Sequence, residues 1–452
     1  MLTSFWHFRF CGWIYCRWTV GKGKVKRVMG KHRNKLVWIL VFVLTLCSCN
    51  GNIRSEKGEA TAKEKTRIVI LSPYTESNTD AITEYFRLAI DQAREAFPDC
   101  EIIHDTINTE TYKNKVKIHM AADEPVDIFF TWTGGFLDPF IRKGKVLSLN
   151  DYVADEENVM QLTGMQNEEM RRGEDIYGLT FVNWYGTLYC NEEIFEQFSL
   201  EVPQTWDEFL YVSSKLRRNG VEPIACGLMD IWPGHLYINQ LMLQLAGAEM
   251  YNGIADKKVE CDEAVMKEVG TYITQLINAG AFHSNALRMS NDASITAFIE
   301  GKAAMLYNGS NISHQLTGSP VDGHVRAVPL PRVEECRYPR DYLGKTSTGI
   351  CVSAGTKNPQ KAVAVALFIA RQVAVNDGSL VTWDIPDQDR KMTDVDEQIL
   401  SYTRMADGWG NNYDVELESR DAQDYLGAVL KLYTKESDAG QFAREAADIL
   451  NR

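Results

Sequence analysis

The sequence predicts an α/β protein built on a parallel sheet, and three observations support this class. Residues 67–71 form a short apolar run bounded by a Ser-Pro pair, as expected of a buried strand. Apolar side chains then recur at close to the helical period through residues 82–97. Two further strand-like runs, at 100–107 and 126–130, flank an amphipathic segment at 112–122. A strand, helix, strand, helix, strand order implies parallel strands joined by crossover helices.

Later segments continue this alternation. Thr205 and Glu208 have the spacing of a capping box, which predicts that a helix begins at Trp206 and that this tryptophan packs in the core. The C-terminal part reads as mostly helical, with a break near 408–412. The other elements are predicted as strands at 186–190, 303–307 and 349–353, and as helices at 206–218, 235–247, 262–279, 292–300 and 358–373.

Composition limits the classes of protein that this chain can belong to. Of its 452 residues, 45% are hydrophobic and 24% charged, which excludes a disordered or collagen-like chain. Length and apolar content allow two or three domains. The net charge of -13 argues against a nucleic-acid partner. Residues 1–48 hold nine basic and no acidic side chains, so the remainder has 39 basic against 61 acidic side chains, a balance of -22.

The basic N-terminus predicts a secretory leader over residues 1–48. Basic side chains precede an apolar run at 36–46, which is shorter than the roughly 20 residues that span a bilayer. The sequence Leu46-Cys47-Ser48-Cys49 resembles a bacterial lipobox, which implies lipidation of Cys49 and a membrane anchor. Because a signal peptide of ordinary length begins at Met29, we expect that residue to be the true start.

Residues 49–66 are polar and rich in small side chains, so we expect a flexible tether there. Six cysteines follow in the body without a C-x-x-C pair, which leaves one or two disulfides or buried free thiols as alternatives. No histidine or cysteine spacing indicates a metal site, and no cofactor motif or common hydrolase signature is present.

Four passages together resemble extracellular solute-binding protein family 1, the sugar-binding lipoproteins that serve ABC importers. The most specific is the run at 177–195 followed by 203–209, although Thr180 replaces the usual proline and Cys190 the usual tyrosine. The others are at 125–132, 297–305 and 349–363.

This resemblance implies a two-lobed periplasmic-binding-protein fold of type II, with a hinge that the chain crosses more than once. It assigns 67–178 and 310–365 to the first lobe, and 185–304 and 370–452 to the second. The crossings are then expected near 179–185, 305–310 and 365–372. It also implies an extracytoplasmic monomer that captures a solute between the lobes by hinge closure and delivers it to importer permease subunits.

Carbohydrate recognition needs aromatic rings for the apolar faces of a sugar and polar groups for its hydroxyls. The resemblance and the positions of such residues in predicted loops give a set of candidate ligand-binding residues: Glu76, Trp132, Asn183, Trp184, Asp230, Trp232, Asn308, Trp383 and Trp409. We predict no catalytic residue and no cofactor.

Three alternatives remain open. Carboxylates at Glu76, Asp127, Asp230 and Asp384 would suit a polyamine or another cationic solute. The same fold can act as a sensory subunit that reports to a membrane kinase. Paired carboxylates beside tryptophans are also what a glycoside hydrolase needs, although the order of the motifs favours a binding protein.

Overall fold

The computed structural model describes residues 65–78, 80–122, 126–153, 168–283 and 285–452. The predicted leader, the start at Met29, the lipidated Cys49 and most of the tether lie outside these residues. None of the helices within the described ranges is both long and apolar enough to cross a membrane.

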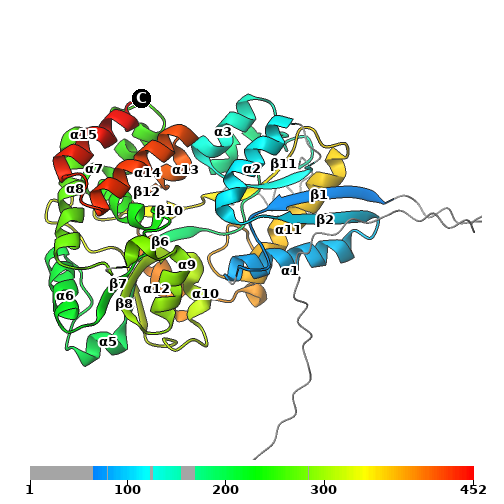
Figure 1. Cartoon of the computed structure of the whole chain (residues 1–452). Helices are drawn as coiled ribbons and strands as arrows, with labels where there is room; N and C mark the ends of the chain where they lie inside the picture. The colour runs from blue at the N-terminus through cyan, green and yellow to red at the C-terminus, as the bar shows by residue number, and fades with distance from the viewer. Residues whose placement is uncertain (1–64, 79, 123–125, 154–167, 284) are drawn as a thin grey trace, which may run out of the picture. The chain divides into compact units, whose positions relative to one another are not determined.

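The first lobe is an α/β layer with a four-stranded sheet in the order β11-β3-β1-β2 (Figure 1). β1 (Thr66–Ser72) runs parallel to β2 (Cys100–Thr106) and to β3 (Ile128–Trp132), whereas β11 (Thr348–Val352) is antiparallel to β3. This confirms the predicted parallel arrangement of the first three strands. The helices of this lobe are α1 (Ala81–Ala96), α2 (Thr109–Ala122), α3 (Gly134–Arg142) and α11 (Pro359–Asp377).

The second lobe contains a mixed sheet in the order β12-β10-β6-β8-β7, with β9 paired to β6. β6 is antiparallel to β8, β9 and β10, whereas β7 is parallel to β8. The strands are β6 (Trp184–Asn191), β7 (Glu222–Ala225), β8 (Ala303–Gly309), β9 (Val325–Val328), β10 (Asp341–Lys345) and β12 (Gly408–Gly410). A separate pair is formed by β4 (Arg171–Arg172) and β5 (Asp175–Ile176).

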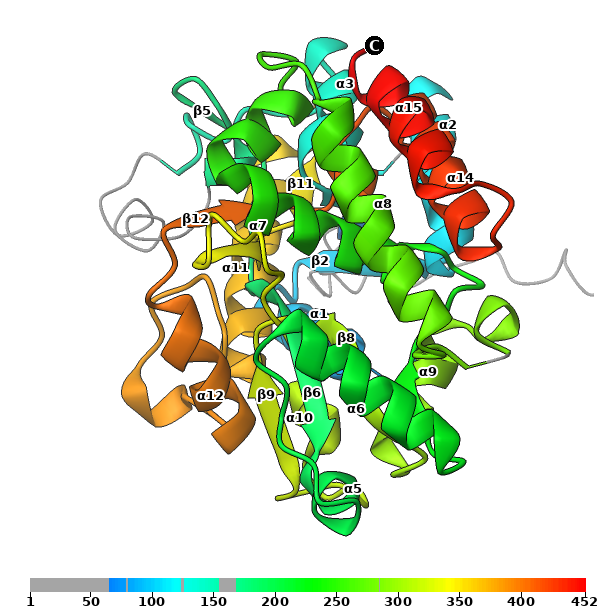
Figure 2. The ribbon, with the colours of Figure 1, turned by 90° about the vertical axis from the view of Figure 1, so that its left-hand side faces the viewer.

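Helices bury the second sheet (Figure 2). α7 supplies the largest share of buried side chains, because nearly all of its positions up to Ala248 are buried. The helices are α5 (Glu192–Gln197), α6 (Trp206–Arg218), α7 (Trp232–Ala255), α8 (Glu263–Asn278), α9 (Asn291–Ile299), α10 (Ser313–Leu316), α12 (Asp394–Thr403), α13 (Tyr413–Glu416), α14 (Ser419–Tyr433) and α15 (Ala439–Leu450). Short 3-10 turns cover Glu168–Met170, Ala286–Arg288, Ser310–Ile312 and Asp387–Asp389.

The capping box of α6 is present as predicted. The Thr205 hydroxyl accepts from the Glu208 amide at 3.4 Å, and the Glu208 carboxylate accepts from the Thr205 amide at 3.1 Å. Trp206 is 3% exposed, and its ring packs against Phe209 and Tyr272 in the second lobe. Its assignment to the core is therefore confirmed.

The structure places two lobe boundaries differently from the sequence-based expectation. β9 and β10 belong to the second sheet, so the chain does not cross at 305–310 but passes from β10 to β11 at 346–347. α11 stays in the first lobe up to residue 377 and packs on α1, so the crossing expected at 365–372 comes after this helix. The first error arises because β9 and β10 have only four and five residues, carry little periodic signal, and pair with strands that are distant in sequence.

Candidate functional site

The direction of the strands determines at which edge of each sheet the candidate residues lie. Trp132 is the last residue of β3, and Asn308 lies next to the last residue of β8. Trp184 is the first residue of β6, which runs antiparallel to β8, so its start lies beside the end of β8. Ligands of open α/β sheets bind beyond the carboxyl ends of the strands. We call Trp132, Trp184, Asp230 and Asn308 the facing-edge site.

In the second lobe, Asn308 and Asp230 are tied together through α9. The Asn308 amide donates to Asn291 Oδ1 at 2.8 Å, and the Asn291 backbone amide donates to Asp230 Oδ2 at 2.7 Å. Asn308 Oδ1 accepts from the Gly309 amide at 2.8 Å, and the side chain is only 2% exposed. Asn308 therefore fixes the loops at this edge, while Asp230 stays half-buried with one carboxylate oxygen free of that bond.

Carboxylates gather beside this cluster. Burial raises the pKa of Asp292, and the carboxylates of Asp80 and Asp230 raise it further. Asp80 belongs to the first lobe, where it caps α1 by accepting from the Thr83 amide at 3.0 Å. Negative charge from both lobes thus faces the same region.

The indole of Trp184 is positioned by a glycine. A side chain at Gly309 would overlap the indole nitrogen of Trp184 and Oδ1 of Asn311. Because only glycine leaves this space open, the strand end at Gly309 allows the half-buried Trp184 to lie across it.

Trp132 stands in an aromatic cluster of the first lobe. Its ring makes edge-on contacts with Phe130, Phe136 and Tyr112, at centroid distances of 5.0, 5.1 and 6.0 Å. The ring remains half-buried. Lys113 Nζ from α2 lies over it, 5.1 Å from the ring centroid. The cluster holds the indole rigidly, as a stacking platform requires.

Residues of α13 and of the start of α14, which belong to the second lobe, contact this part of the first lobe. Lys113 Nζ is 4.0 Å from Asp414 Oδ2, and Lys117 Nζ donates to Ser419 Oγ at 2.7 Å. Burial raises the pKa of Asp414, whereas Lys113 favours its charged form. The backbone of α13 also contacts α3, since a side chain at Gly135 would overlap the carbonyl of Glu416. α13 and the start of α14 therefore bring charged and polar groups next to the Trp132 cluster.

Not all of the predicted residues meet at the facing edges. Trp383 is 4% exposed in the core of the first lobe, and its indole donates to the carbonyl of Thr180 at 2.6 Å. Asn183, 7% exposed, accepts from the Thr346 hydroxyl at 3.0 Å. These two residues join the segments that cross between the lobes. For Trp383 this corrects the prediction, because neither its ring nor its indole N–H is available to a solute.

The remaining three predicted residues have mixed surroundings. The Glu76 side chain is 90% exposed and lies 3.7 Å from Arg87, so it points to solvent. Trp232 begins α7 two residues after Asp230 and is half-buried against the second-lobe core. Trp409 packs on Tyr185, with the ring centroids 5.1 Å apart.

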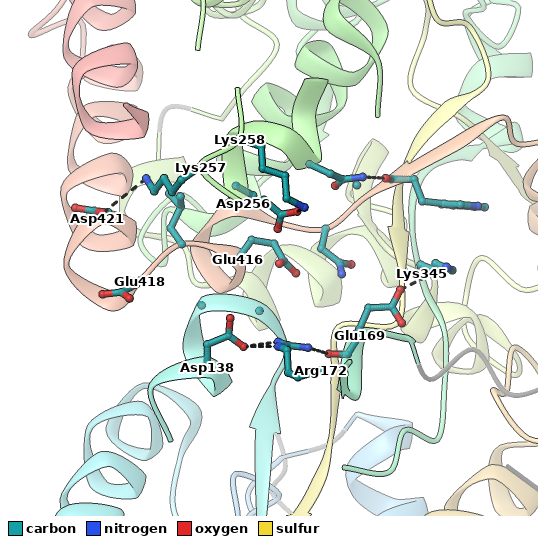
Figure 3. Close-up of a pocket in the computed structure, with 18 of the residues that line it drawn as sticks. Asp138, Glu169, Arg172, Asp256, Lys257, Lys258, Lys345, Glu416, Glu418 and Asp421 are labelled. Atoms are coloured by element: carbon teal, nitrogen blue, oxygen red, sulfur yellow. Dashed lines mark hydrogen bonds and ion pairs between the residues drawn. The ribbon is translucent and has the colours of Figure 1, made fainter. Parts of the chain in front are cut away.

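A charged pocket of about 910 Å³ lies close to the facing-edge site and includes Trp409 (Figure 3). Its acidic and basic groups pair with one another: Arg172 binds Asp138, and Lys345 Nζ is 3.5 Å from Glu169. Burial raises the pKa of Glu416, which projects into it, to about 7. Of the nine predicted residues, Trp409 alone lines this pocket.

Sequence reasoning missed Lys113, Asp414 and Asn291. Asn291 stands at the first position of α9, so its place at a helix start was the one available signal. No sequence signal indicated Lys113 or Asp414, because α13 has only four residues and α2, which holds Lys113, is some three hundred residues away in sequence.

No group of three or more histidine, cysteine or acidic side chains suited to a metal ion occurs in the part of the chain that the structure describes. The six cysteines of the body are unpaired, and five of them are buried. Of the two alternatives left open by the sequence, the structure therefore has free thiols.

Comparison with known proteins identifies the family. The family model for bacterial extracellular solute-binding proteins matches residues 77–374. An uncharacterized ABC transporter extracellular-binding protein of Pyrococcus horikoshii is 24% identical over 367 residues, which is 77% of this chain and 81% of that protein.

Solved structures share the fold. One, from a study of xylan utilization by the thermophile Caldanaerobius polysaccharolyticus, has a TM-score of 0.79 and 27% identity, and covers 84% of this chain and 99% of its own. A chitin oligosaccharide binding protein has a TM-score of 0.76 and 19% identity, with coverage of 86% and 98%. The two-lobed fold and the family match over residues 77–374 lead to one conclusion: this chain belongs to the bacterial extracellular solute-binding protein family.

Proposed function

We propose that this extracellular solute-binding protein captures a carbohydrate at the facing-edge site and delivers it to an ABC importer. The observation that carries the proposal is the pairing of two half-buried tryptophans with polar groups at the facing edges. Trp132 and Trp184 offer apolar faces, whereas Asp230, which is held in place by the hydrogen bonds of Asn291 and Asn308, offers a carboxylate for hydroxyls. Two of the solved structures that share the fold come from work on xylan utilization and from a chitin oligosaccharide binding protein, which supports a sugar ligand.

Family membership indicates an extracytoplasmic protein. We extend this to a monomer anchored in the membrane by lipid on Cys49, with the acidic body held away from the membrane by the tether at 49–66. Mass spectrometry of the membrane fraction tests the anchor. A diacylated N-terminal peptide that begins at Cys49 is expected, and an unmodified mature N-terminus elsewhere would contradict it.

Capture requires that the lobes close on the solute, and the order of the chain suits such a motion. Three segments pass between the two sheets, and the two at 179–184 and 346–347 are joined by the Asn183–Thr346 hydrogen bond. Short connecting segments of this kind act as a hinge, about which the two lobes rotate as rigid bodies.

A second candidate is a cationic solute, because Asp80, Asp230 and Asp292 direct negative charge to one region of the facing edges. A polyamine would neutralise these carboxylates. The chemistry of Trp132 favours the sugar, since the ring is already covered by the ammonium of Lys113, and a second cation would meet like charge there.

A thermal-shift screen of sugars, polyamines and other small solutes tests the proposal. A solute that binds only the folded protein raises the melting temperature by mass action. We expect one or more oligosaccharides to do so, followed by a saturable titration in calorimetry. Stabilisation by polyamines alone would establish the second candidate, and turnover of chromogenic glycosides would show a hydrolase.

The role of an importer partner is tested in cells. Deletion of the gene should abolish growth on the stabilising sugar at low concentration, and growth should return with a plasmid copy. Unchanged uptake together with a lost transcriptional response to the sugar would instead indicate a sensory subunit.

A further inference from the structure

Lys113 lies over the ring of Trp132, which the proposed function assigns to the solute. Its Nζ lies 5.1 Å from the centroid of Trp132 and 4.0 Å from Asp414 Oδ2. Lys113 and Trp132 belong to the first lobe, whereas Asp414 comes from α13 of the second lobe. The lysine side chain is 27% exposed and that of Asp414 only 10%. The ammonium is thus held at the boundary between the lobes, over an aromatic face.

Two forces keep the ammonium there. A cation over an indole face is attracted by the negative charge of the ring quadrupole. A carboxylate as buried as Asp414 also needs a counter-charge, since an unpaired buried charge is costly. The position of Lys113 satisfies both.

A sugar that stacks on this face of Trp132 uses the same surface as the ammonium, because its C–H groups also pack against the electron-rich side of the ring. The ammonium and the sugar cannot both lie there. Stacking therefore requires that Lys113 leave the ring, while Asp414 becomes available to accept from a sugar hydroxyl.

We propose that Lys113 is a specificity-determining residue of the solute site, because its ammonium competes with the solute for the face of Trp132. The inference rests on the proposed function and adds a selection rule to it. Only a neutral ring with an apolar face large enough to replace the Lys113 contacts binds at this end of the site, and a cationic solute is repelled by the displaced lysine.

The chain provides a matched control one helical turn away. Lys117 also bridges the lobes, since it donates to Ser419 Oγ, and its Nζ lies 5.0 Å from the centroid of Phe136. It therefore also joins the lobes and lies over an aromatic ring, but its partner across the lobes is a hydroxyl and not a carboxylate, and we do not place its ring in the site. A lysine that acts only by joining the lobes would behave the same at either position.

The test is a calorimetric titration of the sugar found by screening into the parent, Trp132→Ala and three lysine variants, at low and at high ionic strength. Salt screens the Lys113–Asp414 attraction, so the parent should bind more tightly as salt rises. Lys113→Ala should bind about two- to fivefold more tightly than the parent at low salt, the range that a partly exposed ion pair supplies. Its affinity should not depend on salt. Lys113→Arg should keep the salt dependence of the parent, and so should Lys117→Ala.

Several outcomes would overturn the inference. Weaker binding by Lys113→Ala at low salt would make the lysine a ligand contact and not a competitor. Equal changes in Lys113→Ala and Lys117→Ala would reduce both to general contacts between the lobes. If the sugar binds and Trp132→Ala does not weaken it, the inference fails while carbohydrate capture stands. If no sugar binds the parent or Lys113→Ala, the proposed function itself fails.

Discussion

The indole nitrogen of Trp184 lies where a side chain at residue 309 would stand. This contact links the start of β6 to the end of β8, which are neighbouring antiparallel strands. Because Trp184 sits at the edge that faces the first lobe, the absence of a side chain at Gly309 decides where its ring points.

Gly309→Ala should therefore displace the Trp184 indole and weaken solute binding by about tenfold or more. The added methyl group overpacks the strand end, which also costs about 1–3 kcal/mol of folding stability. Calorimetry gives the affinity and chemical denaturation the stability. Gly427→Ala is the control, because a side chain there meets no neighbouring atom. Unchanged affinity in Gly309→Ala would show that the solute does not touch Trp184.

Trp132→Ala should weaken sugar binding by about 1–3 kcal/mol, because the stacking area of the ring is lost. Trp232→Ala should have an effect of the same size if its half-buried ring contacts the other face of the sugar. Trp383→Phe serves as a comparison, since this tryptophan is buried and bonded to Thr180. Unchanged titration heats in both alanine variants would place the solute elsewhere, with the charged pocket as the next site to test.

Glu416 predicts a pH dependence of stability. Burial raises its pKa from 4.5 to about 7, so the folded protein favours the neutral carboxyl group. An acid with a raised pKa contributes stability that is fully present below its unfolded pKa and is lost as pH rises through the folded value. The loss is expected between about pH 4.5 and 7, and is on the order of 3 kcal/mol.

The measurement is the difference in unfolding free energy between the parent and Glu416→Gln across this pH range. The difference should change in favour of the glutamine variant as pH rises, because glutamine cannot ionise. A difference that stays constant with pH would mean that Glu416 is ionised throughout, held by neighbours such as Arg172.

Thr205→Ala should lower stability by about 1 kcal/mol, because α6 loses the side-chain acceptor of its first turn. Chemical denaturation measures the change. Solute affinity should stay as in the parent, since the cap lies at the exposed start of α6 and involves none of the facing-edge residues. Thr205→Ser retains a hydroxyl and should recover most of the loss.

Local patterns in the sequence predicted much of the fold. The parallel strands β1, β2 and β3, the capping box at Thr205 and the buried Trp206 all followed from periodicity, cap chemistry and burial of apolar runs. These signals act within a few residues, so the sequence shows them directly. The pairing of β9 and β10 did not follow, because each of these strands gains its place only from a partner far away in the chain.

The candidate site, too, was predicted only in part from the sequence. The sequence by itself indicated that Trp132, Trp184, Asp230 and Asn308 come at the ends of strands or in loops. The tertiary structure decided which of the predicted residues are buried, as Trp383 is. It also brought Lys113 and Asp414, which the sequence did not indicate, next to Trp132. The physical reason is that the charge and packing around a side chain depend on elements brought together from both lobes, and no local pattern records them.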